Sequence, residues 1–312
     1  MHPLINYNSA RELKAFLEER NLGMRKKFGQ NFLINPAARA KLLDALALAE
    51  GDEVWEIGPG LGAMTAGLLE KGAKVTAFEI DPAFIGILRE IFASRAFGPE
   101  AAFRLIEGDV MKTWKKTSGL ISADDKTSME ELFLLGNLPY NVAAALLADF
   151  IENGRFFKRL VVTVQREVAM RMSAKPCTAD YSSFSVLCSS VYKVTPLSII
   201  KGASFYPAPR VDSQGVLMEL LPEREEKGKF FNPLVRALFS SRRKIIKNTL
   251  SSFAASVIMK ADNKRGSKMT SAELTEYVLN RAGISGERRP ETLAVQDFAV
   301  LSAILEEALS NG

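Results

Sequence analysis

Histidine and cysteine are scarce in this chain of 312 residues, which holds one histidine and two cysteines. The single histidine, His2, lies at the N-terminus, so we expect no His-based general base, no Ser-His-Asp triad and no metal site. Cys177 and Cys188 have no histidine nearby, which argues against a zinc site and against a disulfide framework. We expect both to be small buried residues in a reducing cytoplasm. The chemistry must therefore depend on other side chains.

Long apolar runs are absent as well. No stretch of about 18 apolar residues occurs, so we expect no membrane-spanning helix. The first residues lack the basic and apolar regions of a signal peptide, so we expect none. With 47% hydrophobic and 25% charged residues, the composition is that of an ordinary globular protein. The length predicts about two domains.

Acidic residues are scarce in one part of the chain. The net charge is +5, and residues 236–268 contain nine basic residues with Asp262 as the one acid. Such a local excess is the footprint expected for a polyanionic partner such as a nucleic acid. The alternative is a helix face that is merely solvated. Arg243 and Lys247 are four residues apart, so they would lie on one face of a helix expected over 242–260.

Alternating strands and helices dominate the first two thirds of the chain. After a helix over 9–20, a loop at 24–33 and a helix from Asn35, we expect strands and helices in a βαβ rhythm. The expected strands are 53–57, 74–79, 101–106, 132–136 and 159–165, and the helices between them include 61–71, 82–95 and 142–151. This rhythm predicts a parallel sheet covered on both faces. Strand-like runs at 192–200 and 214–220 would close one edge, as an antiparallel pair.

The last part of the chain has a helical pattern. A linker-like stretch over 221–229 is followed by expected helices at 232–239, 242–260, 271–281 and 292–309. We therefore predict an N-terminal extension (1–23), an α/β domain (24–221) and a smaller all-helical domain (222–312). The basic residues at 236–268 assign nucleic-acid binding to the helical domain.

Three predicted strand ends carry residues that suit a nucleoside. The first strand runs into Gly58 and Gly60, where glycine lets a ligand approach the backbone closely. The second ends at Glu79, whose carboxylate can accept hydrogen bonds from ribose hydroxyls. The third ends at Asp109, which can accept the amine of an adenine. A solvated strand end for Glu79 and a helix cap for Asp109 are the alternatives, but the three together predict a nucleoside pocket.

The glycine loop by itself fits two kinds of cofactor. Gly58, Gly60 and Ala63 nearly match the dinucleotide fingerprint, so a hydride-transfer enzyme is a competing interpretation. Pro59 and Glu56 favour S-adenosylmethionine, because this cofactor carries a sulfonium and an ammonium group that a carboxylate attracts. It also has no pyrophosphate to place on a helix N-terminus. We therefore expect S-adenosylmethionine.

The box Asn137-Leu138-Pro139-Tyr140 follows the fourth strand and suits a nucleobase amine. The Asn137 oxygen and the carbonyl of Leu138 or Pro139 can accept the two amine hydrogens, and Tyr140 offers a flat face for stacking. These bonds would draw the nitrogen toward a nucleophilic geometry without prior removal of a proton. The target base must leave its stack, and Phe205 could enclose it from the other side. An ordinary turn for the box and core packing for Phe205 are the alternatives.

With these motifs in place, the chain resembles the small-subunit rRNA adenine dimethyltransferases from Met24 to about Leu309. The matching segments are 26–33, 56–62, 79–81, 108–110, 137–140, 165–169, 205–213, 238–244 and 288–293. The glycine loop is generic to methyltransferases, whereas the 137–140 box, the 205–213 segment and the basic tail are specific to the family. The chain departs from the pattern in a longer, more polar connection over 111–131 and in Tyr-Ser-Ser at 181–183, where a glycine is expected.

The resemblance implies a Rossmann-like class I methyltransferase sheet with a helical C-terminal domain. It implies dimethylation of the N6 amines of two adjacent adenines, in a hairpin near the 3′ end of small-subunit rRNA, during cytoplasmic ribosome biogenesis. The expected partner is the rRNA or the pre-30S subunit, and the expected state is a monomer. Residues expected at the cofactor are Gln30, Asn31, Leu33, Glu56, Gly58, Gly60, Glu79, Ile80, Asp109, Val110 and Asn137. Those expected at the reacting base are Asn137, Leu138, Pro139, Tyr140 and Phe205. Those expected at RNA are Arg25, Lys26, Lys27, Arg242, Arg243, Lys244 and Lys247.

Two other functions stay open on the sequence. One is methylation of a different polynucleotide, such as large-subunit rRNA in the resistance-type enzymes, or DNA. The other is a mainly RNA-binding assembly factor that keeps the fold. The intact acids at Glu79 and Asp109 argue against a purely structural role, and the match through the C-terminal helices favours small-subunit rRNA.

Overall fold

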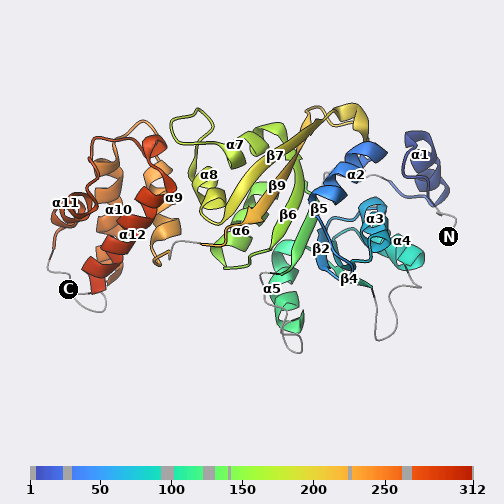
Figure 1. The fold of residues 1–312 in the computed structure, drawn as a ribbon, viewed down its shortest axis with the longest axis horizontal. Helices are drawn as coiled ribbons and strands as arrows, with labels where there is room; N and C mark the ends of the chain where they lie inside the picture. Colours follow the sequence, from blue (N-terminus) through green and yellow to red (C-terminus); the bar gives the residue numbers. More distant parts are fainter. Residues whose placement is uncertain are drawn as a thin grey trace. The chain divides into compact units, whose positions relative to one another are not determined.

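The computed structural model describes residues 5–23, 30–92, 102–121, 131–139, 142–223, 227–261 and 269–310. The chain divides into two compact units (Figure 1). The first comprises residues 1–169 and 193–220, and the second comprises residues 170–192 and 221–312.

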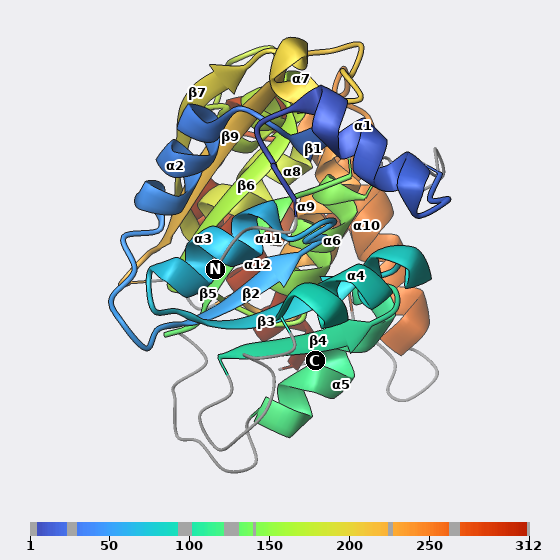
Figure 2. The same cartoon turned by 90° about the vertical axis from the view of Figure 1, so that its right-hand side faces the viewer.

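A seven-stranded sheet forms the centre of the first unit, with the order β4-β3-β2-β5-β6-β9-β7 (Figure 2). The strands are β2 (Glu53–Ile57), β3 (Lys74–Glu79), β4 (Phe103–Glu107), β5 (Phe133–Asn137), β6 (Arg159–Gln165), β7 (Tyr192–Ile200) and β9 (Ser213–Leu220). Strands β2 to β6 are parallel, and β9 runs antiparallel to β6. The parallel strands therefore bring the ends of β2, β3, β4 and β5 to one edge, as the sequence predicts.

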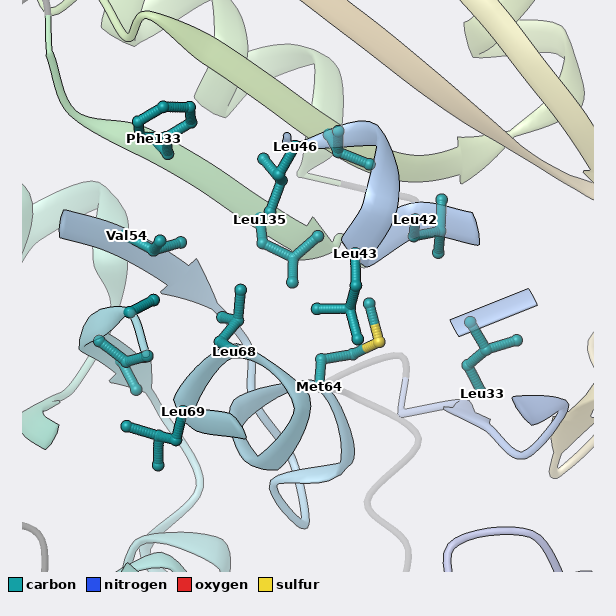
Figure 3. Close-up of a cluster of buried hydrophobic side chains, with 14 of the residues drawn as sticks. Leu33, Leu42, Leu43, Leu46, Val54, Met64, Leu68, Leu69, Phe133 and Leu135 are labelled. Carbon is teal, nitrogen blue, oxygen red and sulfur yellow. The ribbon is translucent and has the colours of Figure 1, made fainter. Parts of the chain in front are cut away.

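Helices cover both faces of this sheet, because neighbouring strand residues point in opposite directions. Val54 belongs to the hydrophobic cluster that also contains Leu43 and Leu68, on one face (Figure 3). Trp55 turns to the other face, where its ring lies 6.5 Å from that of Phe150. The first face is covered by α2 (Pro36–Ala45), α3 (Ala63–Glu70) and α4 (Pro82–Phe92), and the second by α5 (Val110–Ile121) and α6 (Ala143–Glu152).

Short elements precede the first large strand. Helix α1 (Ala10–Glu19) starts at Ser9, whose side chain accepts a hydrogen bond from the Glu12 N–H, and α2 starts at Asn35 with Pro36 in its first turn. Between them, β1 (Phe32–Leu33) pairs antiparallel with β8 (Phe205–Tyr206), which follows the 3₁₀ helix η3 (Gly202–Ser204). This small sheet, which the sequence analysis did not predict, fixes the segment next to Asn31.

Helix α5 corrects one expectation, since the sequence predicts a polar connection over residues 111–131. Of the side chains described in α5, Trp114 and Thr117 are buried, three residues apart on one face of the helix. Tertiary contacts hold this face. The Trp114 ring packs edge-on against Phe150 at 5.2 Å, and its Nε1–H donates to Asp149 at 2.7 Å.

The second unit is built from helices around its own hydrophobic core. These are α8 (Ser183–Ser189), α9 (Phe231–Phe239), α10 (Ile246–Ala261), α11 (Ser271–Ala282) and α12 (Val295–Ser310), with a 3₁₀ helix η4 (Pro290–Thr292); α7 (Arg166–Ser173) spans the boundary between the units. Residues 170–192 join this unit although the sequence places them in the α/β domain. Tyr181 and Val186 lie in the helical core, and the Tyr181 hydroxyl donates to the Leu293 carbonyl at 2.9 Å.

The structure confirms the expected burial for one of the two cysteines. Cys188 is buried, as expected, but Cys177 is exposed, because it lies in a connecting segment before α8. Both thiols are free. None of the described helices is long and apolar enough to cross a membrane.

Candidate active site

A cavity of about 330 Å³ lies at the edge of the sheet where β2, β3, β4 and β5 end. The glycine loop after β2, the last residue of β3, the residues after β4 and the box after β5 all line it. Three acids, Glu56, Glu79 and Asp109, are among its lining residues, and the described part of the lining has no lysine or arginine. Three carboxyl groups at one cavity suit a cationic ligand.

Backbone conformation explains the glycines of the loop. Gly58 and Gly60 have φ angles of 68° and 58°, in the left-handed region that disfavours other residues. A Cβ at Gly58 would meet no atom within 4 Å, whereas one at Gly60 would lie 3.0 Å from the Phe32 ring. Gly58 thus leaves open space on its side of the loop, and Gly60 allows Phe32 to approach.

The carboxylate of Glu79 holds the loop from the neighbouring strand. One oxygen accepts a hydrogen bond from Gly60 N–H at 3.1 Å, and the other accepts from Ile80 and Asp81 N–H, each at 2.8 Å. The side chain is 5% exposed, and this burial raises the pKa of Glu79 although the three backbone bonds oppose the shift. Glu79 therefore shapes the loop and places carboxylate oxygens at the cavity.

Asp109 and Ile80 line the cavity just after the ends of β4 and β3. One oxygen of Asp109 accepts a hydrogen bond from the Met111 N–H at 3.0 Å, at the start of α5, so the helix-cap interpretation describes part of its role. Asp109 nevertheless lines the cavity together with Ile80, an apolar side chain that is 41% exposed. A carboxylate beside an exposed apolar surface can hold the amine and the face of a purine.

Glu56 is the most deeply buried acid at the cavity, with 2% of the residue exposed. Burial raises the pKa of Glu56 to about 8, and the charge of Glu79 acts in the same direction. The hydroxyl of Thr65, which donates to the carboxylate at 2.6 Å, opposes the shift. Glu56 is thus a carboxyl group that a bound cation would help to ionise.

Glu56 should make the stability of the free protein fall with rising pH. Between the ordinary glutamate pKa of 4.5 and the folded value of about 8, the folded protein keeps a proton that the unfolded chain has lost. The stability that neutral Glu56 contributes is complete below pH 4.5 and is lost as the pH rises to about 8, by at most ~1.4 kcal/mol per unit. Urea unfolding from pH 5 to 8 should show a shallower decline for Glu56→Gln. Glu53→Gln, at the other end of β2, is the matched control, and equal slopes for wild type and Glu56→Gln would contradict the assignment.

Asn137 has its amide group oriented by the segment before β1. Its Nδ2 donates to the carbonyl oxygen of Asn31 at 2.8 Å. Because a carbonyl can only accept, the nitrogen must face Asn31, and Oδ1 is the atom that can accept from an incoming amine. The Pro139 carbonyl already accepts from Val142 and Ala143 N–H, both at 3.1 Å. This leaves the Leu138 carbonyl as the stronger candidate for the second acceptor.

The family model described as "Ribosomal RNA adenine dimethylase" matches residues 21–278. This chain belongs to the ribosomal RNA adenine dimethylase family. Its relatives include proteins named "Ribosomal RNA small subunit methyltransferase A". The one from Treponema denticola is 44% identical over 96% of each chain, and the one from Treponema pallidum is 39% identical over 97% of this chain and 99% of the relative. The chain is accordingly an S-adenosylmethionine-dependent rRNA adenine dimethyltransferase.

Solved structures agree on the fold of this dimethylase. A dimethyladenosine transferase from Plasmodium falciparum has a TM-score of 0.69 at 23% identity, covering 88% of this chain and 97% of the other. The 23S rRNA methyltransferase ErmE has a TM-score of 0.58 at 19% identity, covering 88% and 99%. These likenesses show the class I methyltransferase fold that the sequence predicts.

The structure gathers the cofactor residues predicted for the dimethylase around one cavity. All of the predicted positions line it, namely Gln30, Asn31, Leu33, Glu56, Gly58, Gly60, Glu79, Ile80, Asp109, Val110 and Asn137. They come from four strand ends and from the 30–33 segment, which Gln30 anchors by donating to Asp81 at 2.8 Å. Their contact with the cofactor itself stays a prediction.

Only some of the base-contacting residues predicted for the dimethylase line the cavity, among those that the structure describes. Pro139 lines the cavity, and Leu138 is buried against the sheet with its N–H bonded to the Thr163 carbonyl. Phe205 is 3% exposed and lies in the hydrophobic cluster of the sheet, paired with Leu33 across the small sheet. This burial favours the packing alternative for Phe205. Tyr140 lies outside the described residues.

The predicted RNA-binding residues of the dimethylase also need one correction. Helix α10 begins at Ile246, so Arg242, Arg243 and Lys244 lie in the turn before it and not on a helix face shared with Lys247. All four are exposed; Arg242 donates to the Ala179 carbonyl at 3.0 Å, and Lys247 pairs with Glu276 at 3.1 Å. Residues 25–27 lie outside the described part of the chain.

Sequence reasoning missed part of the cavity wall of the dimethylase. Tyr7 and Leu13 line the cavity, although the sequence assigns residues 1–23 to an N-terminal extension and predicts no site residue there. Phe32 also lines it, next to Gly60 and 5.5 Å from the Phe84 ring. No motif marks Tyr7, and its position emerges only once α1 has packed against the glycine loop.

Proposed function

We propose that this dimethylase acts on small-subunit rRNA and converts two adjacent adenines near its 3′ end to N6,N6-dimethyladenines. The relatives at 39–44% identity, which match over almost their whole length, support small-subunit rRNA over large-subunit rRNA. The acidic cavity beside the Asn137 amide is the observation that carries the chemistry, because it joins a place for a cationic cofactor to an acceptor for a base amine.

The proposed mechanism depends on positioning. When bound, S-adenosylmethionine supplies an electrophilic methyl group on a sulfonium sulfur. Asn137 Oδ1 and the Leu138 carbonyl accept the two hydrogens of the adenine amine, which turns the nitrogen lone pair toward the methyl carbon. Methyl transfer would form the N–C bond as the C–S bond breaks, with the electron pair kept by sulfur. The methylated nitrogen would release a proton to water, and the second methyl group would come from a second molecule of S-adenosylmethionine.

The proposed substrate can be tested with labelled S-adenosylmethionine and small subunits from a strain that lacks this methylation. We expect four methyl groups per subunit, on two adjacent adenines, and no label in large subunits. Naked rRNA and partly assembled subunits, tested in parallel, determine which form is the substrate. Label in large-subunit rRNA alone would favour the resistance-type alternative, and RNA binding without transfer would favour an assembly factor.

We further propose that the enzyme works in the cytoplasm as a monomer. The described residues that line the cavity all belong to the first unit, which supports a site built within one chain. Light scattering after size-exclusion chromatography should give the mass of one chain, 34.3 kDa. A stable dimer would contradict this proposal without affecting the chemistry.

The exposed basic turn before α10 is proposed to bind rRNA phosphates. Phosphate contacts position a protein without reading bases and weaken with added salt. Reversing Arg243 and Lys244 to glutamate should therefore weaken binding to small-subunit rRNA. It should also flatten the salt dependence by somewhat under one unit of slope per lost contact. S-adenosylmethionine affinity should be unchanged.

A matched charge reversal serves as the control for that variant. Lys41 and Lys74 are also exposed, and Lys74 starts β3, at the opposite end of the strand from Glu79. Lys41→Glu with Lys74→Glu makes the same change in net charge and should leave the salt slope nearly as in the wild type. If both double variants bind equally across a salt series, the turn before α10 is an ordinary solvated surface.

A further inference from the structure

The segment before α1 and the start of α1 form part of the wall of the cofactor cavity. Tyr7 and Leu13 line the cavity, and the Tyr7 hydroxyl donates a hydrogen bond to the carbonyl of Leu61 at 2.9 Å. Leu61 lies in the glycine loop, between Gly60 and Gly62. Burial, with a further contribution from the charge of Glu56, raises the pKa of Tyr7, so the phenol stays protonated and remains a donor.

A buried arginine fixes this segment in place. Arg39 of α2 is 9% exposed, and its guanidinium donates to the carbonyls of Tyr7, at 3.3 Å, and Leu33, at 2.7 Å. It also donates to the side-chain oxygen of Asn8. Leu33 belongs to the 30–33 segment that lines the same cavity, so one guanidinium joins two chain segments on the cavity wall. A fork of rigid donors suits this task.

Apolar packing holds the same wall. Ile5, Leu13 and Leu17 are buried in one hydrophobic cluster with Leu61 of the glycine loop and Phe84 of α4. Tyr7 and Phe32 pack against this cluster. The N-terminal segment is therefore joined to the loop by apolar contacts as well as by the Tyr7 hydrogen bond, and its removal would expose the loop.

The position of Tyr7 identifies the part of the ligand that it faces. In the sheet, β4 with Asp109 and β3 with Glu79 mark the places proposed for adenine and ribose, so the aminoacyl end must lie toward β2 and β5. Tyr7 contacts the loop after β2 and lines the same cavity as the β2 residue Glu56. Tyr7 thus lies at the end opposite the adenine.

We infer that Tyr7 is a positioning residue for the methionine end of S-adenosylmethionine, held by Arg39 against the glycine loop. The inference rests on the proposed placement of the cofactor. Tyr7 lines the cavity, as Glu56 does, and its hydroxyl fixes the Leu61 carbonyl and with it the loop that the aminoacyl group would touch. Loss of Tyr7 should loosen binding of the aminoacyl group and leave binding of the nucleoside unchanged.

A pair of ligands separates these two ends. S-adenosylhomocysteine carries the aminoacyl group, and 5′-methylthioadenosine has the same nucleoside and sulfur without it. Calorimetry should show that Tyr7→Phe lowers the affinity for S-adenosylhomocysteine by roughly 3- to 10-fold, the equivalent of one neutral hydrogen bond. Tyr7→Ala, which also removes the ring, should weaken it by more than about 10-fold. The affinity for 5′-methylthioadenosine should change by less than about 2-fold in either variant, as expected for a substitution that does not contact this ligand.

Kinetics and a matched tyrosine complete the test. The KM for S-adenosylmethionine should rise in the Tyr7 variants while kcat at saturation stays near the wild-type value. Tyr206→Phe is the control, because Tyr206 packs against the same hydrophobic cluster but is not among the residues that line the cavity. Melting temperatures without ligand report any loss of fold.

The outcomes distinguish this inference from the cofactor assignment. If the wild type binds neither ligand, the proposed cofactor site fails. In a second outcome, the wild type binds both ligands while the Tyr7 substitutions lower both affinities equally or lower neither. The cofactor site then stands, and the assignment of Tyr7 to the methionine end is overturned. A selective loss of S-adenosylhomocysteine, with Tyr206→Phe unchanged, supports it.

Discussion

Replacing Asn137 with alanine should lower the rate of methyl transfer by roughly 100-fold or more, the effect expected for loss of one preorganised polar contact. Asn137 is held ready for this contact, since its Nδ2 is bonded to the Asn31 carbonyl and its Oδ1 is thereby turned to accept. Alanine removes the acceptor that orients the base amine. Single-turnover transfer to small subunits, at saturating S-adenosylmethionine, measures the effect on the chemical step.

Two further variants sharpen the Asn137 prediction. Asn137→Asp keeps acceptor oxygens but places a carboxylate against the Asn31 carbonyl, so its orientation should be lost and its rate should stay low. Asn153→Ala is the matched control, because Asn153 caps the far end of α6 and bonds to Asp149. Near-wild-type turnover in Asn137→Ala, with the Asn153 control also active, would refute the role in positioning the amine.

Removing the carboxylate of Glu79 should produce the largest loss of cofactor affinity. Glu79→Ala should weaken binding of S-adenosylmethionine by about 1–3 kcal/mol, or 5- to 150-fold in affinity, through unpaired ribose hydroxyls alone. The three backbone N–H groups that Glu79 now satisfies would also lose their acceptor, and Gly60 would lose its tie to β3. Ribose is common to S-adenosylhomocysteine and 5′-methylthioadenosine. The affinities for both ligands should therefore fall together, unlike in the Tyr7 variants.

The control for Glu79 comes from the adjacent strand. Glu107 lies opposite Glu79 in the pairing of β3 and β4, but it is exposed, pairs with Arg89 and is not among the residues that line the cavity. Glu107→Ala should leave cofactor binding within about 2-fold of the wild type. Calorimetry that finds tight NAD binding and no S-adenosylmethionine binding would overturn the cofactor assignment altogether.

Much of the α/β unit could be predicted because its signals are local. Strands β3 and β6 occupy the predicted ranges 74–79 and 159–165, since buried parallel strands are short apolar runs between turns. The cap residues Ser9 and Asn35 begin their helices as expected. Glu79 and Asp109 were placed together because parallel strands end at one edge of a sheet.

Elements that depend on contacts between distant segments could not be predicted in this way. Helix α5 buries few side chains, and its contact with Phe150 joins residues far apart in sequence. Strands β1 and β8 have two residues each and exist because Phe32 and Leu33 meet a segment about 170 residues later. The start of α10 at Ile246 depends on backbone bonds to Gly286 and Arg288 that no local propensity reveals.

The sequence by itself determined the chemistry of this protein, because glycines, acids and the Asn-Leu-Pro-Tyr box carry their function in residue type and strand position. Only the tertiary structure decided which side chains close the site. It turned Phe205 into the core, oriented the Asn137 amide through Asn31 and brought Tyr7 to the cavity through Arg39. These outcomes depend on hydrogen bonds and packing between distant segments, and a linear pattern does not contain the distances on which such contacts depend.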